Sequence, residues 1–323
     1  MQEISSRDIR AWSKFGQKGS VFGVALPRIA EEDESVYVLT ADLMRLSGLQ
    51  RFHNLYPDKL VNVGIAEQNM IGIASGLAFE GNSVFATTYA SFITMRCYEQ
   101  IRHNLGYQNA DVKLIGSSSG LVMGFSGNTH YTYEDIGIMR MIPNIKILSP
   151  CDALEAYKMT YLAYQTKGPV YIRLSGSLQN PIVYKEDYVL EIGKAITLRE
   201  GKDVVIFTTG SMVSESLKAA EKLAAEKINA TVVNMHTISP LDHEIIERHL
   251  EASLFVTVEE HRMSGGLYSA ICEYISLKKR RPPHLSIGIH KPYLPVGDYE
   301  YLKKLCGLNS EDIAFKILEV LKK

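Results

Sequence analysis

Residues that would indicate a secreted, membrane-spanning or metal-binding protein are scarce in this sequence. Only four cysteines occur among 323 residues: Cys97, Cys151, Cys272 and Cys306. They form no CxxC pair and no cluster with histidines at zinc spacing, so reduced thiols are expected rather than disulfides or a metal site. No apolar run reaches the roughly 18 residues of a membrane helix, and no signal peptide is recognisable. We therefore expect a soluble, cytoplasmic protein.

An excess of charge of either sign is also missing. Lys plus Arg number 35 and Asp plus Glu number 36, which leaves a net charge of −1. This balance gives no electrostatic reason to expect binding to nucleic acid or to an anionic membrane. Glycine-rich phosphate loops of the GxGxxG and Walker types are absent as well. Small metabolites remain open as ligands.

What the sequence does contain is a regular alternation of strand-like and helix-like segments. In the first half we expect strands at residues 35–40, 60–63, 83–87, 112–115, 145–148 and 170–174. Helices are expected at residues 66–79, 92–105, 134–141 and 152–164, and a Gly/Ser loop at residues 116–120. This alternation predicts an α/β fold, with a mostly parallel sheet covered by helices on both faces.

The pattern is interrupted at residues 175–192, which we interpret as a linker, and then restarts. Strands are expected at residues 203–209, 230–235, 254–258 and 285–289, with helices at residues 214–226, 243–249, 267–277 and 311–322. The chain length also favours two domains. We expect the first to cover residues 1–180 and a smaller α/β domain to cover residues 190–323.

The most informative acidic residue is Glu67, at the start of the helix expected at residues 66–79. It shares a helical face with apolar residues: Met70, Ile71, Ala74 and Ala78. We therefore expect a buried carboxyl group, whose pKa burial would raise, so that a neutral acid could donate a hydrogen bond. The alternative is that Glu67 only stabilises the helix dipole from the first turn.

Residues 64–69, GIAEQN, resemble the GIAEQ segment of transketolases and deoxyxylulose-phosphate synthases. In that family the glutamate binds the N1′ atom of the aminopyrimidine ring of thiamine diphosphate and so activates the cofactor. The resemblance implies this catalytic and cofactor-binding role for Glu67, with Ile65 beside it at the cofactor. It also implies the family fold, a pyrimidine-binding domain followed by a transketolase C-terminal domain.

Further segments resemble the family in the same order, over about residues 6–309. Residues 40–43, TADL, resemble a segment that approaches the cofactor, which implies a cofactor contact for Asp42. Residues 87–102 resemble the segment whose aromatic ring stacks on the aminopyrimidine; Phe92 is the first candidate and Tyr89 the second, although alone both rings would be ordinary core. Residues 127–130 and 134–135 resemble the DG-x-THQ…ED segment, which implies contact with substrate oxygens for His130.

The family's diphosphate-binding domain has no counterpart here, because no GDG segment followed by an asparagine occurs. The resemblance therefore implies a separate partner chain that carries this domain and ligates Mg²⁺, so no metal ligand is expected in this chain. It further implies a heterotetramer with two copies of each chain. The expected reaction is transfer of a two-carbon ketol unit from a ketose donor to an aldehyde acceptor, by the beta-type subunit of a split transketolase.

Several substrate-binding positions differ from the family pattern. The aspartate of DG-x-THQ is Ser126, a frequent histidine eight residues earlier is Ser118, and the arginine that binds sugar phosphate corresponds to Gly176. Arg7 and Arg45 remain as candidate cations for the substrate. Losing a bidentate arginine removes about 1.5–3 kcal/mol of charge-assisted hydrogen bonding. We therefore expect an atypical sugar as substrate.

Two other functions remain open. The beta subunit of a 2-oxo acid dehydrogenase has the same two domains, but it carries HSQ where this chain has Thr129, His130 and Tyr131. Lipoyl-dependent activity would favour that function. The second alternative is a non-catalytic subunit that has kept the fold, which an unchanged activity after Glu67→Ala would favour.

Overall fold

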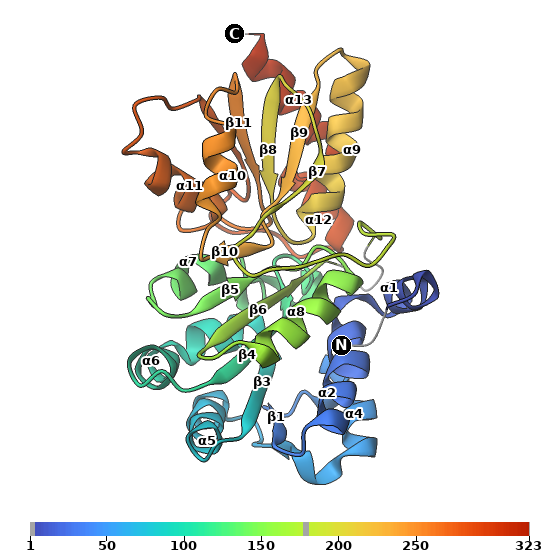
Figure 1. The fold of residues 1–323 in the computed structure, drawn as a ribbon, viewed down its shortest axis with the longest axis vertical. Coiled ribbons are helices and arrows are strands. Elements are labelled where there is room, and N and C mark those ends of the chain that lie inside the picture. The colour runs from blue at the N-terminus through green and yellow to red at the C-terminus, as the bar shows by residue number, and fades with distance from the viewer. Residues whose placement is uncertain (1–3, 177–180, 323) are drawn as a thin grey trace.

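The computed structural model describes residues 4–176 and 181–322 and contains two β-sheets, stacked along the long axis of the molecule (Figure 1). The first sheet has seven strands in the order β10-β5-β6-β4-β3-β1-β2, and the second has five in the order β12-β11-β8-β9-β7. Most neighbouring strands are parallel; β10 and β7 pair antiparallel at the sheet edges. The predicted α/β fold with mostly parallel sheets is confirmed.

The strands of the first sheet are short, apolar and mostly buried, as expected for parallel strands covered on both faces. They are β1 (Val36–Thr40), β2 (Leu60–Asn62), β3 (Ser83–Tyr89), β4 (Val112–Ser119), β5 (Lys146–Leu148), β6 (Val170–Ser175) and β10 (Thr237–Ser239).

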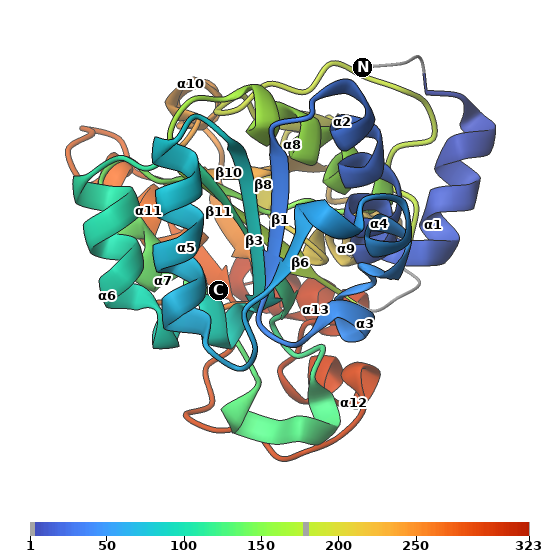
Figure 2. The same ribbon diagram turned by 90° about the horizontal axis from the view of Figure 1, so that it is seen from below.

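Helices cover both faces of this sheet (Figure 2). One face carries α5 (Glu67–Phe79), α6 (Tyr98–Gln100) and α7 (Asp135–Arg140). The other carries α1 (Ser6–Ser20), α2 (Leu26–Glu32), α4 (Gln50–Leu55) and α8 (Ala153–Gln165). The short helix α3 (Met44–Ser47) follows β1.

Helix α1 was not anticipated from the sequence, although its start has a clear local signal. The Ser5 hydroxyl accepts from the Asp8 backbone N–H, and the Asp8 carboxylate accepts from the Ser5 N–H, which together form a capping box. On its buried side, Trp12 stacks on Tyr157 of α8 with ring centroids 4.3 Å apart. This packing fixes α1 against the sheet, and its last turn consequently reaches the end of β4.

The second sheet contains β7 (Ile196–Arg199), β8 (Val204–Thr208), β9 (Ala230–Asn234), β11 (Leu254–Val258) and β12 (His284–Ile287). Its helices are α9 (Met212–Ala225), α10 (His243–Arg248), α11 (Leu267–Ile275), α12 (Tyr299–Leu305) and α13 (Ser310–Leu321). Strand β10 lies between β9 and β11 in the chain but pairs with β5, so the C-terminal half completes the first sheet. The domain boundaries at residues 180 and 190 stay a prediction, and residues 177–180 of the expected linker lie outside the described residues.

Two local predictions were wrong. The continuous helix expected at residues 92–105 is divided into the π-helix η3 (Phe92–Arg96), α6 and the π-helix η4 (Ile101–Tyr107). The loop expected at residues 116–120 is largely strand, because β4 continues to Ser119 and pairs there with Ser175. This part of β4 needs glycine at residue 116, because a Cβ atom there would lie 2.5 Å from the Tyr171 hydroxyl. Across the described ranges, the structure contains no helix both long and apolar enough to cross a membrane.

Candidate active site

The predicted site residues gather at the carboxyl ends of four neighbouring parallel strands. Asp42 follows β1, Glu67 follows β2, Tyr89 ends β3 and Ser118 lies near the end of β4. Parallel sheets commonly bind ligands in the crevice outside these strand ends. The order β4-β3-β1-β2 thus brings together side chains that are far apart in the sequence.

Three aromatic rings form a compact group, here called the ring wall: Tyr89, Phe92 and His130. The ring centroids lie 5.7 Å apart for Tyr89 and Phe92, 5.2 Å for Phe92 and His130, and 5.9 Å for Tyr89 and His130. His130 comes from the turn after the 3-10 helix η5 (Gly124–Thr129), and its Nδ1 lies 2.9 Å from the Thr129 hydroxyl. The structure therefore brings these three predicted residues together.

Glu67 is the first residue of α5 and is only 4% exposed. Arg96 Nη1 donates a hydrogen bond of 2.5 Å to its Oε1 atom, and the Arg96 guanidinium lies 4.1 Å from the centroid of the Phe92 ring. Arg96 therefore joins Glu67 to the ring wall. The predicted burial of Glu67 is confirmed, but the sequence suggested an apolar setting and gave no indication of the neighbouring cation.

The thiol of Cys97 is fully buried next to this ion pair. Burial and the negative charge of Glu67 raise its pKa to about 12. Cys97 is thus a protonated, inert part of the core rather than a nucleophile.

Asp42 and Ser118 both adopt left-handed backbone conformations, with φ of +56° and +55°. Such conformations are uncommon for residues other than glycine and persist where the surrounding structure holds them, often at functional sites. The Asp42 N–H donates to Asn62 Oδ1 at 3.0 Å, which fixes the turn after β1. Ser118 is buried, with its hydroxyl 3.3 Å from Lys18 Nζ.

Lys18, in the last turn of α1, was missed by sequence reasoning because α1 itself was missed. Its ammonium group contacts the Leu46 carbonyl and the Ser118 hydroxyl, both at 3.3 Å. In the described part of the chain no carboxylate forms an ion pair with it. Burial lowers the pKa of Lys18. This half-buried cation lacks a counter-charge, which is typical of sites that bind an anion.

Lys18 also lines a groove of about 550 Å³ between α1 and α3, here called the basic groove. The cations along it are Lys14, Lys18, Arg45 and Arg51, and its other lining residues are apolar or small, without a carboxylate. Arg45, a predicted substrate cation, lies along this groove, and its role stays a prediction. Gly176 and Ser118 line a smaller adjoining pocket that shares Lys18 with the groove.

The remaining candidates are less well supported by the geometry. Arg7 is exposed in the first turn of α1, a non-helical residue, Gly16, separates it from Lys18 along the chain, and no described contact links it to the other candidates. Ser126 is exposed on η5, where its N–H donates to the Met123 carbonyl and its own carbonyl accepts from the Thr129 hydroxyl. The Ile65 side chain is 79% exposed. The roles of these three residues stay predictions.

Within residues 4–176 and 181–322, no group of three or more His, Cys, Asp or Glu side chains is placed to hold an ion. What the arrangement offers is a buried carboxyl group, an aromatic surface and a cationic groove, all at one edge of the sheet.

Comparison with known families gives two matches that together span most of the chain. The transketolase pyrimidine-binding domain matches residues 18–180, and the transketolase C-terminal domain matches residues 193–313.

Among named proteins, the chain is 37% identical to a putative transketolase C-terminal section from Methanocaldococcus jannaschii, over 94% of this chain and 95% of that protein. It is 38% identical to a 6-deoxy-6-sulfo-D-fructose transketolase subunit from a Clostridium species, over 90% of each chain. It is also 38% identical to 1-deoxy-D-xylulose-5-phosphate synthase from Caldanaerobacter subterraneus, but it spans only 48% of that protein.

Among solved structures, a split-gene transketolase described as an inactive beta4 tetramer is 34% identical. Its TM-score is 0.85, and the similarity covers 95% of this chain and 98% of that one. A transketolase variant from Pichia stipitis has the same fold, with a TM-score of 0.75 at 20% identity, and this chain covers 48% of it.

Proposed function

Because the chain belongs to the transketolase family, we propose that it is the beta-type subunit of a split transketolase, which transfers a two-carbon ketol unit with thiamine diphosphate as cofactor. The observation that carries this proposal is the position of Glu67. A buried carboxyl group begins a helix at the carboxyl edge of the sheet, next to the ring wall. This is the pair of features that recognition of an aminopyrimidine ring requires.

The residues present fit one half of a thiamine diphosphate site. Glu67 offers a carboxyl group that can hold a proton at a ring nitrogen, while Phe92 and Tyr89 offer an aromatic surface that orients a flat ring. When bound, the cofactor would supply the nucleophilic carbon and the electron sink for the transferred unit. Asp42 and Ile65 would border the cofactor from the turns after β1 and β2.

In this proposal His130 contacts substrate oxygens. Its Nδ1 is engaged by the Thr129 hydroxyl, and no described contact occupies Nε2. A neutral or charged imidazole fixed in this way can position a hydroxyl or carbonyl oxygen beside the cofactor.

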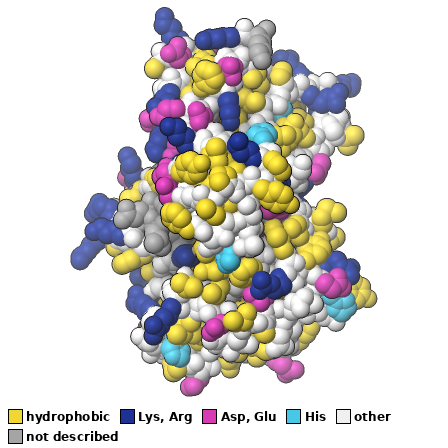
Figure 3. Space-filling model, turned by 180° about the vertical axis from the view of Figure 1, so that it is seen from behind, with side chains coloured by type: hydrophobic (Ala, Val, Ile, Leu, Met, Phe, Trp, Pro, Cys, Tyr) yellow, Lys and Arg dark blue, Asp and Glu magenta, His cyan; other side chains and the backbone are white. Residues whose placement is uncertain are grey.

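We further propose that a separate chain completes the site, as part of a heterotetramer with two copies of each subunit. In this proposal the partner holds the diphosphate and its Mg²⁺. Relatives of nearly the same length are named as a transketolase section or subunit. Apolar side chains also gather over both domains on one face of the molecule (Figure 3), as is common where chains associate.

The basic groove supports a substrate with an anionic end. Lys18 and Arg45 would bind this group, and Ser118 and Ser126 would face the polar part of the sugar. One relative is named for a sulfonated ketose, and a sulfonate, like a phosphate, is a tetrahedral oxyanion. We therefore propose an atypical, anionic ketose as donor.

The decisive experiment replaces Glu67 in the chain reconstituted with a partner that carries the GDG…N segment. We expect Glu67→Gln to lower kcat at least 10²-fold, in the range usual for the loss of a proton-transferring group. Glu80→Gln, at the exposed C-terminal end of the same helix, is the matched control. Wild-type turnover of Glu67→Gln would instead support a non-catalytic subunit, and acyl transfer to a lipoyl protein would support a 2-oxo acid dehydrogenase.

A further inference from the structure

Arg96 makes two contacts that the proposed function assigns to another group. Its Nη1 donates to Glu67 Oε1 at 2.5 Å, and its guanidinium carbon lies 4.1 Å from the centroid of the Phe92 ring. Under the proposed function, an aminopyrimidine ring would lie on the same aromatic surface and hydrogen-bond to the same carboxyl group. Both groups cannot hold these positions together.

The guanidinium group resembles an aminopyrimidine in the properties that matter for these contacts. Both are flat, both carry N–H groups in the plane, and both stack on aromatic faces. Glu67 is 5% exposed at its side chain, so without a cation its carboxylate would be buried and unpaired, which is costly. Arg96 therefore satisfies Glu67 in the way that the ring would.

Arg96 is also able to leave. Its side chain is 46% exposed, in contrast to that of Glu67, so a rotation can carry the guanidinium into water once another N–H donor takes its place at Glu67. Its backbone is held in place, because its carbonyl accepts from Gln68 Nε2 at 3.1 Å. It lies at the end of η3, and π-helical turns of this kind are frequent at functional sites. The mobile part is thus the side chain alone.

We propose that Arg96 is a latch that occupies the aminopyrimidine position in the free subunit and must swing out when the cofactor binds. The latch stabilises the empty subunit and competes with the cofactor for Glu67 and Phe92. This inference rests on the proposed function, because it assumes that these two residues receive the ring.

The first test needs neither cofactor nor partner. Thermal unfolding of the full chain alone is compared for wild type, Arg96→Met, Glu67→Gln and the double variant. We expect Arg96→Met to lower the unfolding midpoint by about 2 °C or more, and by less than half of that in the Glu67→Gln background. Equal effects in both backgrounds would show that Arg96 is not paired with Glu67 and would overturn the latch.

The second test measures the affinity of the reconstituted complex for thiamine diphosphate with Mg²⁺ by calorimetry. The cofactor binds only subunits in which Arg96 has left Glu67, so its apparent affinity is reduced in proportion to the fraction of such subunits. Removing the Arg96 guanidinium makes every subunit able to bind and therefore raises the apparent affinity. We expect Arg96→Met to bind about three- to tenfold more tightly, with Arg96→Lys between it and wild type. Arg102→Met is the matched control, since Arg102 is an exposed arginine paired with Glu99 in the same segment.

The outcomes separate the latch from the proposed function. If Glu67→Gln weakens cofactor binding while Arg96→Met also weakens it or leaves it unchanged, the latch is wrong and Glu67 keeps its role. If neither variant changes cofactor binding, Glu67 does not receive the ring, and the proposed function is wrong together with the latch.

Discussion

Lys18 shows what a single residue contributes to this site. Its ammonium group is half-buried beside Ser118, and its two hydrogen-bonding contacts, at 3.3 Å each, are long. Desolvation of an ammonium group is unfavourable unless something compensates for it. The basic groove, which includes Arg45, offers that compensation only when an anion is bound.

We therefore predict that Lys18→Met raises the KM for an anionic ketose donor about 10- to 100-fold and changes kcat only slightly. A charge-assisted hydrogen bond to a terminal anion contributes about 1.5–3 kcal/mol, and this binding is the same in the ground and transition states. Steady-state kinetics of the reconstituted enzyme measure both KM and kcat. Arg10→Met, an exposed arginine on α1, serves as control. An unchanged KM would remove Lys18 from the substrate site.

At the scale of single elements, α11 depends on a buried acid that directly follows the preceding strand, β11. Glu259, directly after β11, accepts hydrogen bonds from the Leu267 N–H at 2.7 Å and from the Tyr268 N–H at 2.9 Å. The position requires glycine at residue 266, because a Cβ atom there would lie 2.1 Å from Glu259 Oε2.

Burial raises the pKa of Glu259 from 4.5 to about 7 in the folded chain. The folded state then holds a proton that the unfolded state releases between these values, so stability decreases as the pH rises from about 4.5 to 7. We predict that wild type loses stability relative to Glu259→Gln over this interval. Urea unfolding at several pH values measures the difference, with exposed Glu226→Gln as control. A constant difference would contradict the raised pKa.

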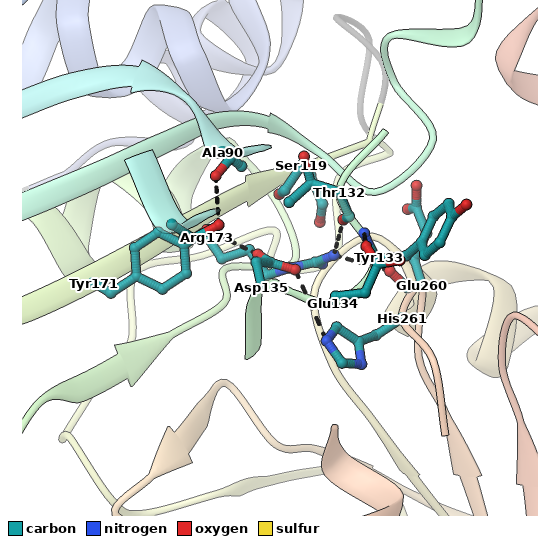
Figure 4. A network of polar contacts seen from close by, with 12 residues as sticks. Ala90, Ser119, Thr132, Tyr133, Glu134, Asp135, Tyr171, Arg173, Glu260 and His261 are labelled. Atoms are coloured by element: carbon teal, nitrogen blue, oxygen red, sulfur yellow. Dashed lines mark hydrogen bonds and ion pairs between the residues drawn. The ribbon is translucent and has the colours of Figure 1, made fainter. Parts of the chain in front are cut away.

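At the scale of the whole molecule, a buried polar network joins the two sheets (Figure 4). Arg173 of β6 donates to Asp135 of α7 at 2.8 Å and to the Glu260 carbonyl, in the C-terminal half, at 2.9 Å. His261 lies against Asp135, and burial lowers its pKa to about 4, so that the neutral ring accepts from the Gly137 N–H. Together with β10, this network makes the two halves one structural unit.

Accordingly, we predict that both halves unfold in one transition and that Arg173→Met destabilises them together, by about 3–5 kcal/mol, because Asp135 is left buried without its cation. Calorimetry combined with near- and far-ultraviolet circular dichroism measures this. Arg199→Met, on the edge strand β7, is a control at a less buried site. Two separate transitions, with only one shifted by Arg173→Met, would contradict the prediction.

Local patterns in the sequence predicted most of the strands and the helices that follow them, because apolar periodicity reports directly on burial. They failed where tertiary contacts override that pattern. The segment at residues 92–105 has the composition of one helix, yet π-helical turns divide it. The polar N-terminus contains no apolar run that would predict a helix, although the side chains of Ile9 and Trp12 on one side of α1 are buried.

By itself the sequence determined the α/β class, the family and the burial of Glu67, since these depend on residue types at short spacing. Only the tertiary structure decided which charges surround the site. Arg96 reaches Glu67 from the segment after β3, and Lys18 reaches Ser118 from α1. Such pairs follow from the order of strands in the sheet and from helix packing, which bring together residues whose separation along the chain gives no sign of contact.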